Sequence, residues 1–503
     1  MGEPGPTAEV AMKAHQLFRI LLHILPLGAS CCLFLMTART RAQGDKSEKR
    51  NIDGTVGAVF FSDIHFEPFW DPEKARQLAN TPVEKWQLIL AAPDSPDRAA
   101  KFAAVQSACP TRGEDTTYAL YDSALRTMRK EASGARFVTV SGDLIAHSFP
   151  CKFKAAFPNA APGEFRAFAE KTVAFVVGSL RRALPGIPVY AALGNNDSDC
   201  GDYQLDANSE FLATIGKVMV ADLPEGEQRR AERDFSTAGY FGVSLPVPIE
   251  HARLLVLDDV FMSRKYATCG GKSDQSPATA QMAWLEQQLK AARRSGEKIW
   301  VMAHIPPGVD PYSTASKGKD VCQGSKPIMF LSSEALPDTL ARYGDVIRLA
   351  IFAHTHMDEL RLLAPVSAKG DGVAVKLVPS ISPFAGNNPS FTVARIDRRS
   401  ATLRDYRVFV ASNQTGVDTR WSEEYDFTRT YGKSDFTAAS LKKLIGEFNR
   451  DPFAQTPASQ NFIRNYTPGM SVLELKPFWP QYVCALNYDS ADAFAACTCS
   501  PMK

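Results

Sequence analysis

Histidine is scarce in this chain, with eight in 503 residues, and five of them fall in four of five short motifs. The motifs are S-D-I-H (62–65), G-D-L-I-A-H (142–147), G-N-N-D (194–197), A-H-I-P-P-G (303–308) and A-H-T-H (353–356). Each follows an apolar stretch with β-strand character: 56–61, 137–140, 189–193, 299–302 and 349–352. Because side chains at the carboxyl ends of successive strands can converge on one point, we expect these motifs to meet.

The residue types in these motifs are those of a site for two divalent cations. Two cations held about 3.5–4 Å apart neutralise the oxygens of a phosphate ester and lower the pKa of a bound water. Such a pair requires a bridging carboxylate together with imidazole and neutral oxygen ligands. The motifs predict seven ligands: Asp63, His65, Asp143, Asn195, His304, His354 and His356.

These seven residues divide between the two predicted ions, with Asp143 as the bridge. We expect Asp63, His65 and His356 to complete the coordination of one ion. The second would use the amide oxygen of Asn195 and two imidazoles. Each short motif taken alone could instead be a turn or a hydrogen-bonded polar group in the core, but five motifs in this order favour the metal site.

The chain resembles the calcineurin-like metallophosphoesterases and, within them, the acid sphingomyelinase-like branch. Three stretches carry the closer resemblance: G-D-L-I-A-H, residues 281–308 with their H-I-P-P-G, and residues 377–397 with L-V-P-S-I-S-P-F-A-G-N-N-P-S-F. The resemblance covers roughly residues 55–500. It implies an α/β fold, a four-layer α/β/β/α sandwich with a small helical, disulfide-containing C-terminal lobe.

The third motif departs from this family, which usually reads G-N-H. The family's histidine binds phosphate and helps to protonate the leaving group, whereas this chain has Asn196. Asparagine donates a hydrogen bond but cannot give up a proton. A related branch, the endopolyphosphatases, also reads G-N-N-D. His147 remains as an imidazole that could act as acid or orient the phosphate, or could hydrogen-bond a ligand carboxylate.

We therefore expect a sphingomyelinase-like phosphoesterase in which a metal-bound hydroxide attacks the phosphorus of a diester. The substrate would be a small-molecule or lipid-headgroup phosphoester, or polyphosphate. Zinc is the expected metal and manganese the alternative, since Ala146 stands where purple acid phosphatases carry the tyrosine that binds iron(III). Two other functions stay open: an endopolyphosphatase or nucleotide phosphoanhydride hydrolase, and a non-catalytic binding protein on the same fold.

The composition and the N-terminal sequence limit the possible partners and cellular locations of the protein. A net charge of +2 and a charged fraction of 22% give no basic track for a nucleic-acid polymer, and the oligomeric state stays open. Residues 17–36 are largely apolar but are interrupted by Arg19, His23 and Pro26. We predict a signal peptide at 1–42, with a signal anchor as the alternative, and a linker at 43–54. The protein would be secreted, periplasmic or lumenal, with membrane attachment only through an uncleaved N-terminus.

Eight cysteines follow this leader, an even number that suggests disulfides in an exported protein. The family resemblance implies a Cys269–Cys322 bond and a bond from Cys484 to Cys497 or Cys499. The partners of three others are left open: Cys109, Cys151 and Cys200.

Strands and helices alternate until about residue 410, which predicts a catalytic domain at 55–410 and a helical C-terminal lobe at 411–503. The predicted helices are 117–132, 163–184, 277–294, 333–343, 435–449 and 457–466. Closely spaced strands are expected at 373–378, 390–396 and 401–410. Residues 71–116 show little periodicity and are expected to form a loop with short helices over the rim of the site.

Overall fold

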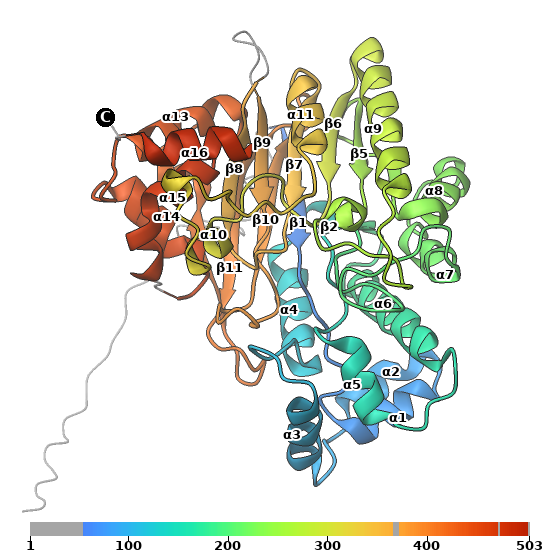
Figure 1. Cartoon of the computed structure of the whole chain (residues 1–503). Coiled ribbons are helices and arrows are strands. Elements are labelled where there is room, and N and C mark those ends of the chain that lie inside the picture. Colours follow the sequence, from blue (N-terminus) through green and yellow to red (C-terminus); the bar gives the residue numbers. More distant parts are fainter. Residues whose placement is uncertain (1–53, 366–371, 471–472, 501–503) are drawn as a thin grey trace, which may run out of the picture. The chain divides into compact units, whose positions relative to one another are not determined.

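Two six-stranded sheets form the centre of the protein (Figure 1). The computed structural model describes residues 54–365, 372–470 and 473–500. One sheet has the order β12-β11-β10-β1-β2-β3 and the other the order β4-β5-β6-β7-β9-β8. The α/β fold with two sheets is confirmed.

The twelve strands of the described residues differ in length, and all except β12 are largely buried. Their bounds are β1 Thr55–Phe61, β2 Ala135–Val140, β3 Val189–Ala191, β4 Phe241–Ser244, β5 Ala252–Val256, β6 Lys298–Met302, β7 Ile347–Phe352, β8 Glu359–Leu363, β9 Val373–Leu377, β10 Ser390–Asp397, β11 Leu403–Ala411 and β12 Trp421–Asp426. Parallel pairing joins β1, β2 and β3 in the first sheet, and β5, β6, β7 and β9 in the second. The eight strands predicted from the sequence are all present, within two residues at each end.

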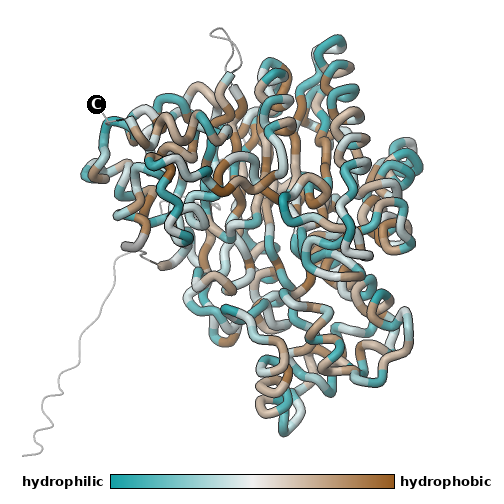
Figure 2. Tube along the Cα trace, viewed as in Figure 1, coloured by the Kyte–Doolittle hydropathy of each residue, from teal (hydrophilic) through white to brown (hydrophobic). Residues whose placement is uncertain are grey.

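The two sheets pack on each other through aromatic side chains. The ring of Trp300 on β6 meets Phe60 on β1 and Phe137 on β2 edge-on, with ring centroids 6.0 and 5.8 Å apart. All three side chains are fully buried. Figure 2 shows hydrophobic residues concentrated along the strands of both sheets. Burial of this apolar surface is the main stabilising contribution, and it fixes one sheet against the other.

Helices lie against the outer faces of the sheets and make up most of the C-terminal region. The α-helices are α1 Pro72–Ala79, α2 Trp86–Ala91, α3 Arg98–Ala108, α4 Tyr118–Glu131, α5 Phe149–Ala156, α6 Glu164–Ala183, α7 Glu210–Met219, α8 Glu225–Ala238, α9 Ser276–Ser295, α10 Pro311–Ser316, α11 Ala335–Arg342, α12 Phe427–Tyr431, α13 Ala438–Asn449, α14 Pro457–Tyr466, α15 Trp479–Ala485 and α16 Ala491–Cys499. The 3-10 helices are η2 Val83–Lys85, η3 Asp259–Met262, η4 Val321–Gln323 and η5 Leu473–Phe478. On the first sheet, α6 contacts β3; on the second, α9 contacts β6 and α13 contacts β8 and β9.

Local signals explain why the predicted helices form where they do. The side chain of Thr117 caps α4 by accepting a hydrogen bond from the amide of Leu120. Pro277 lies in the first turn of α9, and Gly296 ends that helix in the left-handed conformation, with φ at 72°. The six predicted helices are present, and the largest boundary difference is the start of α13.

The long segment between the first two motifs is more ordered than a bare loop. Within residues 71–116 the structure has α1, η2, α2 and α3, in agreement with the prediction of short helices. Its last residues run beside the first motif, where the amide of Thr116 donates to the carbonyl of His65. The segment therefore brings residues near 115 to the edge of the predicted site.

The region after residue 411 contains a strand that the sequence did not predict. Strand β12 pairs with β11 and extends the first sheet, and Trp421 on this strand donates a hydrogen bond to Ser123 on α4. Helices α12 to α16 follow, as expected of a helical lobe. The domain boundary near residue 410 stays a prediction, and the predicted leader lies outside the described residues.

Four disulfides pair all eight predicted cysteines. They are Cys109–Cys151, Cys200–Cys269, Cys322–Cys499 and Cys484–Cys497. The family resemblance left Cys497 and Cys499 open as partners of Cys484, and the structure pairs Cys484 with Cys497.

The predicted Cys269–Cys322 bond is wrong. Cys269 lies beside the 201–204 turn, because Ala267 bridges Gln204, and it therefore meets Cys200. Cys322 lies on η4, which packs against α16 and so meets Cys499. Among the described residues no helix is long and apolar enough to span a membrane.

Candidate active site

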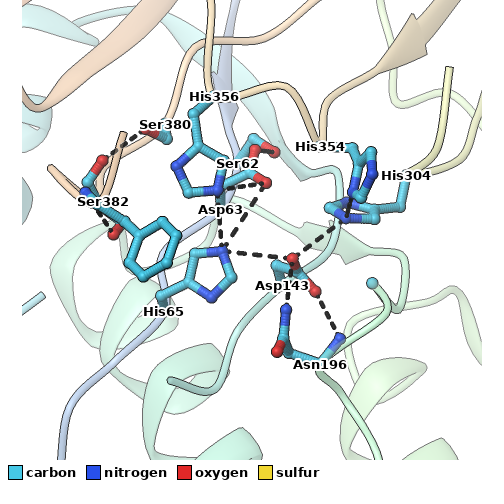
Figure 3. Close-up of polar contacts among 12 residues, drawn as sticks. Ser62, Asp63, His65, Asp143, Asn196, His304, His354, His356, Ser380 and Ser382 are labelled. Atoms are coloured by element: carbon cyan, nitrogen blue, oxygen red, sulfur yellow. Dashed lines mark hydrogen bonds and ion pairs between the residues drawn. The ribbon is translucent and has the colours of Figure 1, made fainter. Parts of the chain in front are cut away.

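The five motifs meet at the carboxyl ends of the parallel strands. The first three follow β1, β2 and β3 of one sheet, and the last two follow β6 and β7 of the other. The seven predicted ligands come together there. Figure 3 shows Asp143 between the side chains of His65 and His304. The convergence expected from the strand-end positions is therefore present in the structure.

The first group of side chains surrounds a shared space on one side of Asp143. His65 Nε2 lies 3.2 Å from His356 Nε2 and 3.3 Å from Asp143 Oδ2. Asp63 Oδ1 lies 3.5 Å from His356 Nε2 and 4.0 Å from His65 Nε2. Two imidazole nitrogens and two carboxylate oxygens thus face one another in this group.

The second group lies on the other side of the same carboxylate. His304 Nε2 is 3.2 Å from Asp143 Oδ2 and 3.1 Å from Asn195 Oδ1. His354 Nδ1 is 3.2 Å from His304 Nε2. The same oxygen of Asp143 is therefore close to both groups, which is the position that a bridging carboxylate requires.

Burial and charge prepare these side chains to hold cations. Burial and the neighbouring imidazole of His147 lower the pKa of His65 to about 3, and burial also holds the pKa values of His354 and His356 well below the usual value. Neutral imidazole is the form that binds metal. Burial opposes ionisation of Asp143, but the imidazoles of His304 and His65 keep the pKa of this carboxyl well below its usual range.

One buried oxygen indicates that the cluster is incomplete as a purely protein assembly. Asp63 Oδ1 finds no hydrogen-bond partner among the described residues, and burial raises the pKa of this carboxyl to about 7. Buried polar atoms in proteins nearly always have partners. A divalent cation next to Asp63 Oδ1 would supply one, and the nitrogen and oxygen donors around it suit zinc or manganese. The residues present therefore fit two divalent cations.

The backbone at the predicted ligands is strained in a way that sequence motifs cannot show. Five of the seven have positive φ although none is glycine: Asp63, His65, Asp143, His354 and His356, with φ between 43° and 72°. Side chains other than glycine rarely adopt this conformation, and such residues cluster at functional sites. The strain supports a functional role for the cluster over a merely structural one.

Two motif glycines are required because the second and third motifs pack very closely. A Cβ on Gly194 would lie 2.2 Å from Asp143 Oδ1. A Cβ on Gly142, which has φ at 93°, would lie 2.8 Å from His304 Nδ1. The glycines therefore let the backbone approach the bridging carboxylate and one of its imidazoles.

Asn196 lies beside the bridging carboxylate. Its backbone amide donates to Asp143 Oδ1 at 2.9 Å, and its side-chain Nδ2 donates to Asp143 Oδ2 at 3.0 Å. The next residue, Asp197, accepts hydrogen bonds from the amides of Leu144 and Gly194 and so holds the second and third motifs together. The amide of Asn196 is thus within reach of the same space as the predicted ligands.

His147 is stacked between two other rings. Its centroid lies 3.8 Å from that of His65 and 3.7 Å from that of Phe384, with interplanar angles of 19° and 12°. Its Nδ1 lies 2.7 Å from Asp115 Oδ1. Burial would lower the pKa of His147, but the Asp115 carboxylate raises it above the usual value. Asp115 is not a predicted metal ligand. The sequence alternative, in which His147 hydrogen-bonds to a ligand carboxylate, is therefore not found in the structure.

Several residues around the cluster were missed in the sequence. Asp115 and Lys152 lie behind His147, and Tyr203 Oη lies 3.1 Å from His354 Nε2, where it orients that ring. Asp115 and Lys152 carry no motif or periodic pattern. The weak signal for Tyr203 was its place in the turn-like 196–203 segment, directly after the third motif.

Comparisons with known proteins agree with this geometry. The model of the calcineurin-like phosphoesterase family matches residues 58–358. The chain is 26% identical to sphingomyelinase phosphodiesterase D of Dictyostelium discoideum over 77% of this chain and 80% of that protein. It is 23% identical to acid sphingomyelinase-like phosphodiesterase 3b of Homo sapiens over 76% and 80% of the two chains. It is also 25% identical to the cyclic GMP-AMP phosphodiesterase of Bos taurus over 58% and 61%.

The family match covers more than half of the chain and includes all five motifs. It confirms the resemblance seen in the sequence, and it supports an enzyme over the alternative of a binding protein. The chain belongs to the calcineurin-like phosphoesterase family and is a metal-dependent phosphoric ester hydrolase.

Proposed function

We propose that this protein hydrolyses phosphodiesters at a centre for two divalent cations that share Asp143. The observation that carries this proposal is the place of Asp143 Oδ2, which lies 3.3 Å from His65 Nε2 in one group and 3.2 Å from His304 Nε2 in the other. Asp63, His65 and His356 would hold the first cation with Asp143. Asn195, His304 and His354 would hold the second.

The chain's own residues would orient the ester and manage its protons. Bound cations would supply neutralisation of the phosphoryl oxygens and a lowered pKa for the attacking water. The Asn196 side chain would donate a hydrogen bond to a phosphoryl oxygen. The side chain of His147 is 19% exposed, while those of His65 and His304 are fully buried, so His147 would reach the substrate.

The proton balance of the reaction follows from these positions. A bond forms between the water oxygen and phosphorus, and the bond from phosphorus to the leaving oxygen breaks. His147 would give a proton from Nε2 to the leaving oxygen. It would then take up the proton that the water releases. Asn196 cannot take part in this transfer, because an amide does not release a proton.

We propose zinc as the metal, with manganese as the alternative. The seven donors are imidazole nitrogens, carboxylate oxygens and one amide oxygen, which both metals accept. Ala146 offers no phenolate for an iron(III) site. The four disulfides and the sphingomyelinase-like relatives support a secreted or lumenal protein.

The substrate class that we favour is a small phosphodiester, either a lipid headgroup diester or a nucleotide diester. The names of the similar proteins refer to sphingomyelinase activity and to cyclic GMP-AMP hydrolysis, and both involve phosphodiesters. A phosphoanhydride hydrolase is the second candidate. Two observations favour it: Asn196 in place of a proton donor, and the exposed Lys265, whose Nζ lies 3.3 Å from Tyr203 Oη near the second group.

A substrate panel with Asn196→His tests which class applies. We expect this variant to raise kcat for an alkyl phosphodiester by up to about 10²-fold and to change polyphosphate or nucleotide anhydride hydrolysis little, because only the alkoxide leaving group needs a proton. Rates would be measured on sphingomyelin, a cyclic dinucleotide, an aryl diester and polyphosphate. Equal gains on diesters and anhydrides would contradict the role given to Asn196. Wild-type activity confined to anhydrides would establish the second candidate.

A further inference from the structure

A row of buried charged groups leads from α5 to the ring of His147. Lys152 Nζ donates hydrogen bonds to Glu67 Oε2 and, at 2.8 Å, to Asp115 Oδ2. Asp115 Oδ1 lies 2.7 Å from His147 Nδ1, and Asp115 Oδ2 accepts a hydrogen bond from the His147 amide at 3.0 Å. The four residues therefore form one continuous hydrogen-bonded row.

Burying the charges of this row costs free energy, so a contribution to stability does not by itself explain the row. The side chains of Glu67, Lys152 and Asp115 are at most 3% exposed. Removing charges from water costs several kcal/mol per ion, and apolar side chains of similar volume fill such a space at least as well. The row is therefore better explained by what it positions than by a contribution to stability.

Stacking alone does not decide how the His147 ring is turned. The rings of His65 and Phe384 on either side fix the plane of the imidazole. A half-turn about the bond from Cβ to the ring preserves that plane and exchanges the two edges of the ring. The contact with Asp115 removes this freedom, because it engages Nδ1 and leaves Nε2 as the nitrogen that faces away from Asp115.

Lys152 in turn holds Asp115. It is the cation that Glu67 and Asp115 share, so without it two carboxylates would lie close together in a buried space. The neighbouring Cys151 is bonded to Cys109, which ties α5 to the segment that carries Asp115.

The segment that carries Asp115 also packs against the loop that carries Phe384, whose ring stacks on His147. A Cβ on Gly113 would lie 2.2 Å from the carbonyl oxygen of Phe384, so the segment that carries Asp115 directly contacts the residue stacked on His147. The lysine, the carboxylate and the stacked rings are thus held as one assembly.

We propose that Lys152 is a positioning residue that acts through Asp115 to turn the His147 ring so that Nε2 faces the leaving oxygen of the substrate. This inference rests on the role proposed above for His147. It assigns a function in the reaction to a buried lysine that lies outside the five motifs.

A double-mutant cycle tests this inference on the metal-loaded full-length protein. We expect Lys152→Met to lower kcat for an alkyl phosphodiester about 10–100-fold, the range seen when a group that orients a metal-site residue is removed. KM and the hydrolysis of an activated aryl diester should change little. In a His147→Ala background, Lys152→Met should lower kcat less than about twofold further, because the residue it positions is gone.

Two controls separate positioning from general loss of structure. Lys74→Met removes another buried lysine, which donates to the carbonyl of Ala92 and to Asp94 and does not touch His147. It should leave kcat for both diesters near the wild-type value. If Lys152→Met does not fold, Lys152→Gln enters the same cycle with a smaller expected loss, because glutamine keeps a donor for Asp115 while removing the charge.

The outcomes of the cycle are distinguishable. Equal losses from Lys152→Met in the presence and absence of His147 would overturn the inference and show an independent structural role. A His147→Ala variant with undiminished alkyl diester hydrolysis would instead contradict the proposed function of His147 itself. A loss that disappears in the His147→Ala background, with two equivalents of metal retained, would establish Lys152 as a positioning residue.

Discussion

Replacing Asp143 by asparagine is expected to lower kcat for an aryl phosphodiester by at least ~10³-fold and to remove at least one equivalent of bound metal. Asp143 Oδ2 lies close to both groups of predicted ligands. An amide preserves the shape of the side chain but brings no negative charge to hold two cations together. Cations of this kind supply several kcal/mol of transition-state stabilisation, and each 1.4 kcal/mol corresponds to a factor of ten in rate.

Metal content by elemental analysis and the rate with saturating zinc or manganese would be measured together. Asp122→Asn is a matched control, since Asp122 lies on α4 and pairs with Arg126 and not with a predicted ligand. This control should retain two equivalents of metal and full activity. An Asp143→Asn protein that keeps both cations and the wild-type kcat would rule out a bridging role.

Replacing His147 by alanine is expected to lower kcat about 10²–10⁴-fold for an alkyl phosphodiester and much less for an activated aryl diester. The reason is that proton transfer to the leaving oxygen is worth about this much when the leaving group is a poor one. The third motif has Asn196 where a histidine could stand. Among the described residues, His147 is therefore the one imidazole near the cluster that is not a predicted metal ligand.

The measurement is a plot of kcat against leaving-group pKa for the wild type and the variant, which should be steeper for the variant. His251→Ala is the matched control, since this histidine is exposed and its Nε2 contacts the carbonyl of Ser295, outside the five motifs. Parallel plots for wild type and His147→Ala would show that His147 gives no proton to the leaving group.

The convergence of the motifs could be predicted because strand ends fix where side chains go. Asp63, Asp143 and His304 each follow a buried apolar strand by two or three residues, and that spacing requires only the strand pattern and the rule for parallel sheets. The helices with clear caps were equally accessible, as Thr117 and Gly296 show.

The parts that could not be predicted depend on contacts between distant segments. Cys269 was assigned to Cys322 by resemblance, but its real partner is decided by the bridge between Ala267 and Gln204. Strand β12 is mostly polar and only one of its residues is buried, so it carries no buried-strand pattern. The contact of Lys152 with Asp115 joins α5 to an insertion without periodicity, and only the folded chain brings them together.

Metal removal and return on the wild-type protein test the central claim most directly. Dialysis against a strong chelator should abolish hydrolysis of an aryl phosphodiester, and titration with zinc or manganese should restore it with a break at two equivalents per chain. This stoichiometry follows from two groups of ligands that share Asp143. A metal-free protein that hydrolyses the diester at the full rate would contradict the account.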